Sequence, residues 1–344
     1  MLSLRAAADL QEAIALRPRL RLASLPTPLD EAPRLSARLG LRVLLKRDDQ
    51  TGLALGGNKA RKLEFLVAEA RALGADVVVT TGGSQSNHAR ITAAACRRAG
   101  LDCHLVLDRG IHPEQQGNLL LDELLGAHVH WLDSQDPAEA TARMEVVAQE
   151  LRAAGRRPHL IPRGGSVPAG AIGYAAFVPE LLEQLGAMGL EPTHLYLCTG
   201  STGTHSGVLT GLTAVGAGMT LPMTLQGISV SRDSAQQSSK VRDLTNRTLE
   251  TLGLGVRIGQ EDVRVDDAYR GPGYGIPTAA TMEAIRIVAM DEGVILDPVY
   301  TGKGMAGLID HARSDRLGPD DVVIFLHTGG SPALFAYHQE LGDF

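Results

Sequence analysis

Short apolar runs alternate with amphipathic stretches along most of the chain. From about Lys59 onward, runs rich in valine, leucine and isoleucine predict buried strands, and the stretches between them predict helices. The predicted strands are 75–81, 101–108, 127–133, 156–162, 193–200, 221–231 and 320–330. The predicted helices are 86–100, 118–126, 138–155, 171–186, 205–218 and 281–293. This alternation is typical of βαβ units, so we predict an α/β fold of open, twisted, mainly parallel sheets with helices on both faces.

Glycine-rich segments follow several of the predicted strands, and we expect them to form loops that carry function. Four of them come directly after strands: TTGGSQSNH (80–88), PRGGS (162–166), CTGSTGTHSG (198–207) and HTGGS (327–331). Three more are GGNK (56–59), GPGYG (271–275) and TGKGMAG (301–307). Open parallel sheets bind ligands at the carboxyl ends of their strands. We therefore predict two sheets, with a ligand in the cleft between a large domain (1–54 and 172–344) and a small one (55–171).

Composition narrows the class of protein. The chain has 344 residues, of which 33 are Lys or Arg and 39 are Asp or Glu, so its net charge is −6. A negative net charge argues against nucleic acid or an anionic membrane as a partner. Its three cysteines, Cys96, Cys103 and Cys198, form no CxxC pair and are expected to be reduced thiols. The amino terminus lacks an apolar signal-peptide core, and no stretch has the roughly 18 apolar residues of a spanning helix. These features predict a soluble, cytoplasmic protein with a small-molecule ligand.

The segment Thr199–Thr204, of sequence TGSTGT, lies between a predicted strand and a predicted helix. Its backbone N–H groups and the hydroxyls of Ser201, Thr202 and Thr204 form an anion cradle at the positive end of a helix, which suits a phosphate. It lacks the Lys-Ser/Thr of a P-loop and the spacing of a dinucleotide fold. The alternative is a glycine-rich turn that only satisfies the helix amino terminus.

Lys59 follows two glycines at the start of a predicted helix, with Arg61 and Lys62 close behind. The helix dipole and these cations would lower the pKa of its amine. A lysine of this kind can form a Schiff base with a carbonyl cofactor or act as a base. The residues alone leave open the alternative of a solvated lysine in the first turn of a basic helix.

The segment from Ser84 to His88 follows a strand and opens a helix. Its exposed N–H groups and hydroxyls suit a substrate carboxylate, while Ser86 or Asn87 would serve equally well as the helix N-cap. Tyr274 and Tyr300 each lie beside glycine or hydroxyl residues, where they could face a ligand or simply stack.

Metal and hydrolase chemistry find little support in the sequence. His128 and His130 alternate on one strand face, but neither a carboxylate nor a third histidine stands at ligand spacing, so we predict a solvated strand edge and no metal. A GxSxG nucleophile elbow is absent. Cys198 is expected to pack in a buried strand.

Four segments, taken in order, resemble one family: KRDDQTGLALGGNKARKLEFL, GGSQSNHARITAAA, CTGSTGTHSG and LDPVYTGKGMAGLI. They are similar to pyridoxal-phosphate enzymes of the tryptophan-synthase-β type (fold type II), in the branch of D-cysteine desulfhydrases and 1-aminocyclopropane-1-carboxylate deaminases. The resemblance runs from about residue 20 to the carboxyl terminus.

The resemblance implies a role for each matching residue. Lys59 would join covalently to pyridoxal 5′-phosphate, and Thr199, Gly200, Ser201, Thr202, Gly203 and Thr204 would hold its phosphate. Asn87 would lie beside the ring hydroxyl of the cofactor. Ser86 would bind the substrate carboxylate and move protons, with Asn87, His88, Tyr274 and Tyr300 as further substrate contacts. The family also implies a homodimer.

Two positions separate the branches of this family. At these positions the deaminase pattern has glutamate and leucine. This chain has Thr301 and Thr328 there, which matches the desulfhydrase pattern. Two hydroxyls near the pyridine nitrogen hold its proton less firmly than a carboxylate does, so the ring is a weaker electron sink. This favours β-elimination over opening of a cyclopropane ring.

We therefore expect a lyase that converts D-cysteine to hydrogen sulfide, pyruvate and ammonia. The alternatives are an L-cysteate sulfo-lyase, then a 1-aminocyclopropane-1-carboxylate deaminase, and, in another class, a non-catalytic phosphate- or nucleotide-binding module. An arginine or lysine able to reach a sulfonate would favour cysteate, and Arg163 is the first candidate.

Overall fold

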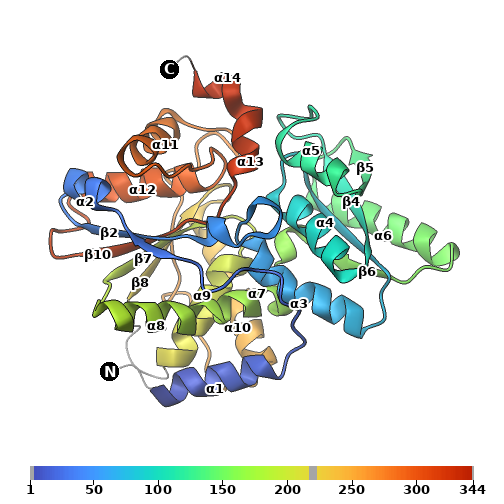
Figure 1. Ribbon diagram of the computed structural model, residues 1–344, viewed down its shortest axis with the longest axis horizontal. Coiled ribbons are helices and arrows are strands. Elements are labelled where there is room, and N and C mark those ends of the chain that lie inside the picture. The colour runs from blue at the N-terminus through green and yellow to red at the C-terminus, as the bar shows by residue number, and fades with distance from the viewer. Residues whose placement is uncertain (1–3, 217–222, 343–344) are drawn as a thin grey trace.

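The computed structural model describes residues 4–216 and 223–342, and its strands form two separate sheets (Figure 1). The large sheet has the order β1-β2-β10-β7-β8-β9, and only β1 is antiparallel to its neighbour. Its strands are β1 (Leu29–Glu31), β2 (Arg42–Lys46), β7 (His194–Thr199), β8 (Thr224–Ser229), β9 (Arg264–Asp266) and β10 (Val322–Leu326).

The small sheet is wholly parallel and has the order β5-β4-β3-β6. Its strands are β3 (Val77–Gly83), β4 (Asp102–Asp108), β5 (His128–Leu132) and β6 (Pro158–Ile161). In sequence, the small sheet lies between β2 and β7 of the large one. The α/β class with two mainly parallel sheets is thus confirmed, whereas the domain boundaries stay a prediction.

Helices cover both faces of each sheet. One face of the large sheet is covered by α2 (Pro33–Leu39), α11 (Ala279–Glu292) and α12 (Thr301–Arg313) (Figure 1). The other face is covered by α1 (Leu4–Ala15), α7 (Pro168–Ala175), α8 (Phe177–Met188), α9 (Gly203–Gly216) and α10 (Ser234–Thr251). The small sheet has α3 (Lys59–Ala72), α4 (Asn87–Ala99) and α5 (Gly117–Leu124) on one face and α6 (Pro137–Ala153) on the other. The short helices α13 (Ser331–Leu334) and α14 (His338–Leu341) end the described chain.

The apolar strand runs reflect burial on both faces. In β10, Val323 and Phe325 belong to the core under α11 and α12, while Ile324 and Leu326 belong to the opposite core. A strand buried on both sides has no polar face, so its sequence is continuously apolar rather than alternating.

Two expectations are corrected. The predicted helix 171–186 is two helices that part at Ala176, because Pro179 has no N–H to donate to the carbonyl of Ala175. The TGKGMAG cluster, expected to be a loop, forms the first half of α12. The predicted helix 205–218 and strand 221–231 also include residues 217–218 and 221–222, which lie outside the described residues.

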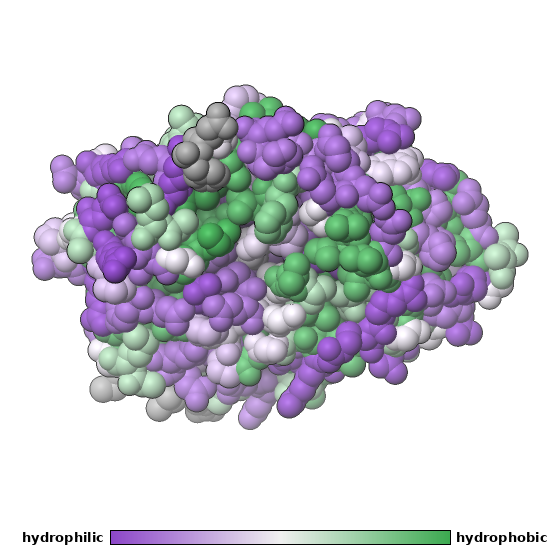
Figure 2. All heavy atoms as spheres, turned by 45° about the horizontal axis from the view of Figure 1, so that its top comes forward, coloured by the Kyte–Doolittle hydropathy of each residue, from purple (hydrophilic) through white to green (hydrophobic). Residues whose placement is uncertain are grey.

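None of the helices in the described ranges is both long and apolar enough to cross a membrane. The predicted glycine-rich loops do follow β3, β6, β7 and β10 at the carboxyl ends of parallel strands. Figure 2 shows that hydrophobic residues gather in patches near the middle of the face in view.

Candidate active site

A pocket lies where the strand ends of the two sheets face each other. It brings together residues from segments that are far apart in sequence: Asn58, Lys59, Asn87, Cys198, Thr199, Gly200, Ser201, Thr202, Thr204, His205, Tyr300, Thr328 and Gly329. Nine of the residues predicted for the site are among them. Ser86, His88, Gly203, Tyr274 and Thr301 lie nearby but do not line this pocket.

The loop before Lys59 is fixed by contacts that only glycine permits. Gly56 has φ +70°, and a Cβ there would lie 1.9 Å from the carbonyl oxygen of Asp49. The N–H of Gly57 donates to the hydroxyl of Thr51 (2.8 Å), and the N–H of Asn58 donates to the carbonyl of Thr328 (2.9 Å). Lys59 is then the first residue of α3. The glycines therefore set the position of the lysine against the loop after β10.

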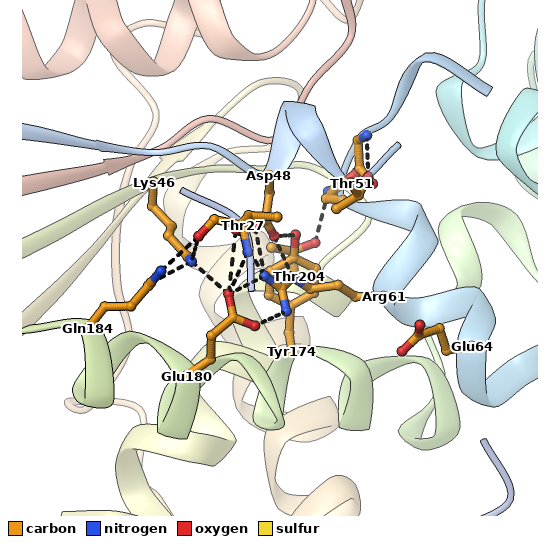
Figure 3. Close-up of polar contacts among 12 residues, drawn as sticks. Thr27, Lys46, Asp48, Thr51, Arg61, Glu64, Tyr174, Glu180, Gln184 and Thr204 are labelled. Atoms are coloured by element: carbon orange, nitrogen blue, oxygen red, sulfur yellow. Dashed lines mark hydrogen bonds and ion pairs between the residues drawn. The ribbon is translucent and has the colours of Figure 1, made fainter. Parts of the chain in front are cut away.

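A buried network of charges anchors the same helix (Figure 3). Arg61 donates to Asp48 (2.8 and 2.9 Å) and to Glu180 (2.8 Å for each oxygen). Lys46 donates to Glu180 (2.6 Å), and Tyr174 donates to Asp48 (2.5 Å). Two cations and two carboxylates balance, which a buried cluster requires. Arg61 thus faces away from Lys59 and ties α3 to α8 and to the turn that follows β2.

Burial from water is the main cause that lowers the pKa of Lys59, to about 8, and the charge of Arg90 lowers it further while Asp297 opposes them. This corrects the sequence argument, which assigned the effect to the helix dipole and to Arg61 and Lys62. Arg61 is neutralised in its own network, and burial and the charge of Lys59 hold the pKa of Lys62 well below its ordinary value. A substantial share of Lys59 is thus the neutral amine near pH 7.5.

We expect the amine of Lys59 in the apo protein to react with an acylating reagent with a midpoint near pH 8, instead of its ordinary 10.5. Arg90→Gln removes a positive charge near the amine, and we expect it to raise the pKa of Lys59 by about one pH unit. Arg98→Gln, on the exposed face of the same helix, is the matched control and should leave it unchanged. Peptide mass spectrometry of the labelled protein across pH measures the midpoint. A midpoint near 10.5 in the unaltered protein would contradict the assignment.

The segment Thr199–Thr204, predicted to be an anion cradle, connects β7 to α9 and lines the pocket. Helix α9 begins at Gly203, so the N–H groups of its first turn have no partner within the helix. Gly203 leaves no room for a side chain, since a Cβ there would lie 2.3 Å from the amine of Lys62. The hydroxyl of Thr204 accepts from the side chain of Asn58 (3.0 Å), which links the cradle to the residue before Lys59. Binding of an anion by these donors stays a prediction.

Lys62 and Ser166 also border the cradle, and the sequence analysis did not assign them. Lys62 donates to the carbonyl of Gly164 (2.5 Å), and the N–H of Gly203 donates to the hydroxyl of Ser166 (3.3 Å). Lys62 follows Lys59 by three residues, a helical spacing that could have indicated a common side of α3.

Asn87 is oriented by two donors. Its amide oxygen accepts from Arg90 (3.2 Å) and from Asn118 (3.0 Å). This leaves its NH₂ group as the free donor at the pocket, which suits a ring hydroxyl or oxyanion. Arg90 also donates to the carbonyls of Ala54 and Gly56, so one buried arginine connects Asn87 with the loop before Lys59.

Ser86 is the N-cap of α4, and its hydroxyl oxygen accepts from the N–H of Ala89 (3.2 Å). The capping interpretation is confirmed, and the hydroxyl proton remains available to a ligand. His88 is buried and shares a hydrogen bond with the hydroxyl of Thr80 (2.9 Å). Burial, with the charges of Lys59, Lys62 and Arg163, holds its pKa well below the ordinary value, so its ring is neutral. Its contact with substrate stays a prediction.

Tyr274 and Tyr300 meet at their phenol oxygens, which are 2.5 Å apart. Removal of the hydroxyl from water raises the pKa of each phenol, although Tyr274 as a whole is 46% exposed, and the pKa of Tyr300 rises well above its ordinary value. Both phenols are therefore protonated at neutral pH. The loop that carries Tyr274 is held by Lys303, a buried residue of α12 that donates to the carbonyls of Arg270 (2.5 Å) and Gly273 (3.0 Å). The sequence analysis assigned no role to Lys303.

Thr301 and Thr328 differ in what their hydroxyls contact. The hydroxyl of Thr301 donates to the buried carboxylate of Asp297 (2.7 Å) and accepts from its backbone N–H (2.7 Å). Asp297 also accepts from the backbone N–H groups of Val299, Tyr300 and Thr301, and so caps α12. The hydroxyl of Thr328 makes no hydrogen bond within the described ranges and faces the pocket. Contact of either hydroxyl with a cofactor ring stays a prediction.

The three cysteines are free and buried, and the thiol of Cys198 donates to the carbonyl of Tyr300 (3.0 Å). The predicted strand edge at His128 and His130 is confirmed, since β5 is an edge strand. A third histidine does join them, contrary to expectation: Nδ1 of His104 on β4 lies 2.9 Å from Nε2 of His130. Spacing along one strand could not indicate it. Even so, the described residues include no group of side chains able to hold a metal ion.

The comparisons with known proteins agree with this geometry. A family model described as "Pyridoxal-phosphate dependent enzyme" matches residues 20–329. The D-cysteine desulfhydrase of Salmonella choleraesuis (strain SC-B67) is 44% identical over 331 residues, which cover 94% of this chain and 97% of that protein. The relative of the same name in Salmonella typhi matches equally well.

Solved structures match along almost the whole chain. A structure described as an ACC deaminase homologue has a TM-score of 0.88 and 38% identity, covering 97% of this chain and 98% of its own. Diaminopropionate ammonia lyase of Escherichia coli, in apo form, has a TM-score of 0.69, covers 99% of this chain and 91% of its own, and is 17% identical, which shows the fold alone.

Proposed function

Because the chain belongs to the pyridoxal-phosphate dependent enzyme family, we propose that it is a carbon–sulfur lyase that converts D-cysteine to hydrogen sulfide, pyruvate and ammonia. The observation that carries this proposal is the amine of Lys59, with its lowered pKa, in the same pocket as the Thr199–Thr204 cradle. The curated relatives named as D-cysteine desulfhydrases support the choice of substrate.

The residues present fit the cofactor. The cradle offers backbone donors and hydroxyls to a phosphate, Asn87 offers an NH₂ group to a ring hydroxyl, and Lys59 offers a nucleophilic amine to an aldehyde. When bound, pyridoxal phosphate withdraws electrons from the substrate carbon that carries the amine.

Lys59 would remove the Cα proton, because its amine is neutral in part at neutral pH and lies in the pocket. The hydroxyl of Ser86 would bind the carboxylate and assist this proton transfer. The paired phenols of Tyr274 and Tyr300, protonated at neutral pH, can donate a proton to the departing sulfur or orient the carboxylate. Loss of hydrosulfide leaves an unsaturated amino acid that hydrolyses to pyruvate and ammonia.

Thr328 is the residue that would face the pyridine nitrogen, since the hydroxyl of Thr301 is bonded to Asp297. A neutral hydroxyl stabilises a protonated nitrogen less than a carboxylate would. Elimination of a good leaving group needs less electron withdrawal than opening of a cyclopropane. This supports elimination and disfavours the deaminase alternative.

The cysteate alternative depends on a cation that could reach a sulfonate. Arg163, the first candidate, donates to Asp108 (2.9 Å) and does not line the pocket. Its charge is therefore already paired, and we favour the neutral thiol of cysteine over a sulfonate as the leaving group of the substrate.

Three further proposals rest on the family resemblance. We propose that the protein is a homodimer and that it acts in the cytoplasm. We also propose that residues 1–54 and 172–344 form its large domain and residues 55–171 its small domain. Light scattering of the purified protein tests the first of these: a mass near twice that of one chain is expected, and the mass of a single chain would contradict it.

Covalent trapping separates this enzyme from a phosphate-binding module. We expect protein purified with pyridoxal phosphate to be coloured, and borohydride to fix one cofactor to the peptide that contains Lys59. Mass spectrometry of the digested protein identifies that peptide. Cofactor that washes away after reduction, or that labels another lysine, would contradict the proposed role of Lys59.

Lys303→Met is expected to lower kcat/KM about tenfold, because the loop of Tyr274 loses the two hydrogen bonds that hold it and small displacements of an active-site group are costly. Cleavage of residues 270–275 by a protease should become faster in the variant. Lys240→Met, on the exposed surface of α10, is the control and should change neither measurement. Unchanged kcat/KM in Lys303→Met would show that the loop needs no such tether.

A further inference from the structure

An ion pair spans the carboxyl end of β3 in the small sheet. Arg163 follows β6 and Asp108 ends β4, and β3 lies between these two strands. Nη2 of Arg163 donates to Oδ2 of Asp108 over 2.9 Å. A Cβ on Gly83, the last residue of β3, would lie 3.2 Å from Oδ1 of Asp108. The pair therefore lies against the segment that leads to Ser86 and Asn87.

The pair acts on the two tyrosines of the site. The charge of Arg163 lowers the pKa of both Tyr274 and Tyr300, and the charge of Asp108 raises that of Tyr274. Both charges are thus within electrostatic reach of Tyr274, one of the two phenols that could donate a proton to the departing sulfur. The two charges act on Tyr274 in opposite directions, so each offsets the other there.

Asp108 is buried, whereas the Arg163 side chain is 36% exposed. The Nε of Arg163 has no hydrogen-bond partner among the described residues. The guanidinium thus retains a donor but lacks a free charge. An anionic group on Cβ of the substrate would therefore gain little from Arg163, because Asp108 already compensates the charge of that arginine.

We propose that Asp108 is a specificity-determining residue, which pairs with Arg163 and so excludes amino acids whose β-substituent is an anion, such as a sulfonate. This inference rests on the proposed function, because it concerns how the same site chooses among leaving groups. The neutral thiol of cysteine would face an Arg163 whose charge is already compensated by Asp108. Without the carboxylate, Arg163 would be free to attract a sulfonate.

The experiment compares kcat/KM for cysteine and for cysteate, each as both enantiomers, with pyruvate as the product measured in the loaded enzyme. Asp108→Asn keeps the shape and the acceptor oxygen but removes the charge, and we expect it to raise the cysteate-to-cysteine ratio about tenfold or more. Arg163→Gln should lower the ratio below that of the unaltered enzyme. The double variant should lose the gain of Asp108→Asn.

The matched control is Asp133→Asn. Asp133 accepts from Arg109 over 2.8 Å near the same edge of the small sheet, but the side chains of both residues are mostly exposed, so the ratio should not change. A ratio unchanged in both Asp108→Asn and Arg163→Gln would overturn the inference, as would a gain that persists in the double variant. The unaltered enzyme tests the proposed function separately: if it turned over cysteate better than cysteine, that proposal would fail whatever the variants did.

Discussion

Replacing Lys59 by alanine is expected to lower kcat for cysteine by about 10⁴-fold, because one side chain supplies both the covalent attachment and the base. The position favours this double role. Lys59 begins α3, its amine faces the pocket, and burial and Arg90 lower its pKa to about 8. The other lysine near the cradle, Lys62, is bonded to the carbonyl of Gly164 and cannot replace it without breaking that contact.

Sulfide release by the purified variant measures this loss, and borohydride should no longer fix the cofactor to the protein. Lys240→Ala, on the exposed surface of α10, is the matched control, with full activity and labelling expected. Lys59→Ala should keep its thermal midpoint, since among the described residues the amine of Lys59 donates to its neighbour Asn58 alone. A Lys59→Ala enzyme with a tenth of the original kcat would show that another group is the base.

Asp48→Ala is expected to destabilise the protein by about 3–5 kcal/mol, the usual effect of removing one member of a buried ion pair. Asp48 is fully buried and accepts from Arg61, Tyr174 and Thr27 (Figure 3). Its loss leaves one carboxylate, Glu180, for the two cations Arg61 and Lys46. Because Arg61 lies two residues after Lys59, activity should fall in the folded variant as well.

Urea unfolding of the apo protein, followed by circular dichroism, measures the change. Asp291→Ala is the control, because Asp291 pairs with Arg38 at the surface (2.6 Å, with the Arg38 side chain 47% exposed) and such pairs contribute about 1 kcal/mol or less. Equal unfolding midpoints for the two variants would show that the buried network does not hold α3 in place.

The strand ends and their glycine loops could be predicted from sequence, because β3, β7 and β10 carry apolar runs that are followed within three residues by glycine. Other elements lack such a signal. Helix α10 buries Gln237, Ser238, Thr245, Asn246 and Thr248 on its inner face, so its sequence has no clear apolar stripe and was not predicted. Strands β1 and β9 have three residues each, too few for a pattern.

The residues at the centre of the site were predicted, but those that orient them were not. Lys59, Asn87 and the cradle were predicted from glycine patterns and family resemblance. Arg90, Asp297 and Lys303 act through contacts that depend on tertiary structure, such as the bond of Lys303 to a carbonyl 33 residues away. The predicted cause of the lowered pKa of Lys59 was wrong for the same reason. Burial, which is the main cause, and the charge of Arg90, 31 residues further along the chain, both depend on tertiary structure.

One assay tests the central claim most directly: pyruvate release by purified, cofactor-loaded protein given D-cysteine, L-cysteine, L-cysteate and 1-aminocyclopropane-1-carboxylate in parallel. We expect D-cysteine to be turned over fastest, with one sulfide for each pyruvate. Turnover of cysteate in preference to cysteine would retain Lys59 and the fold but contradict the assigned leaving group. Turnover of the cyclopropane would contradict the argument from Thr301 and Thr328.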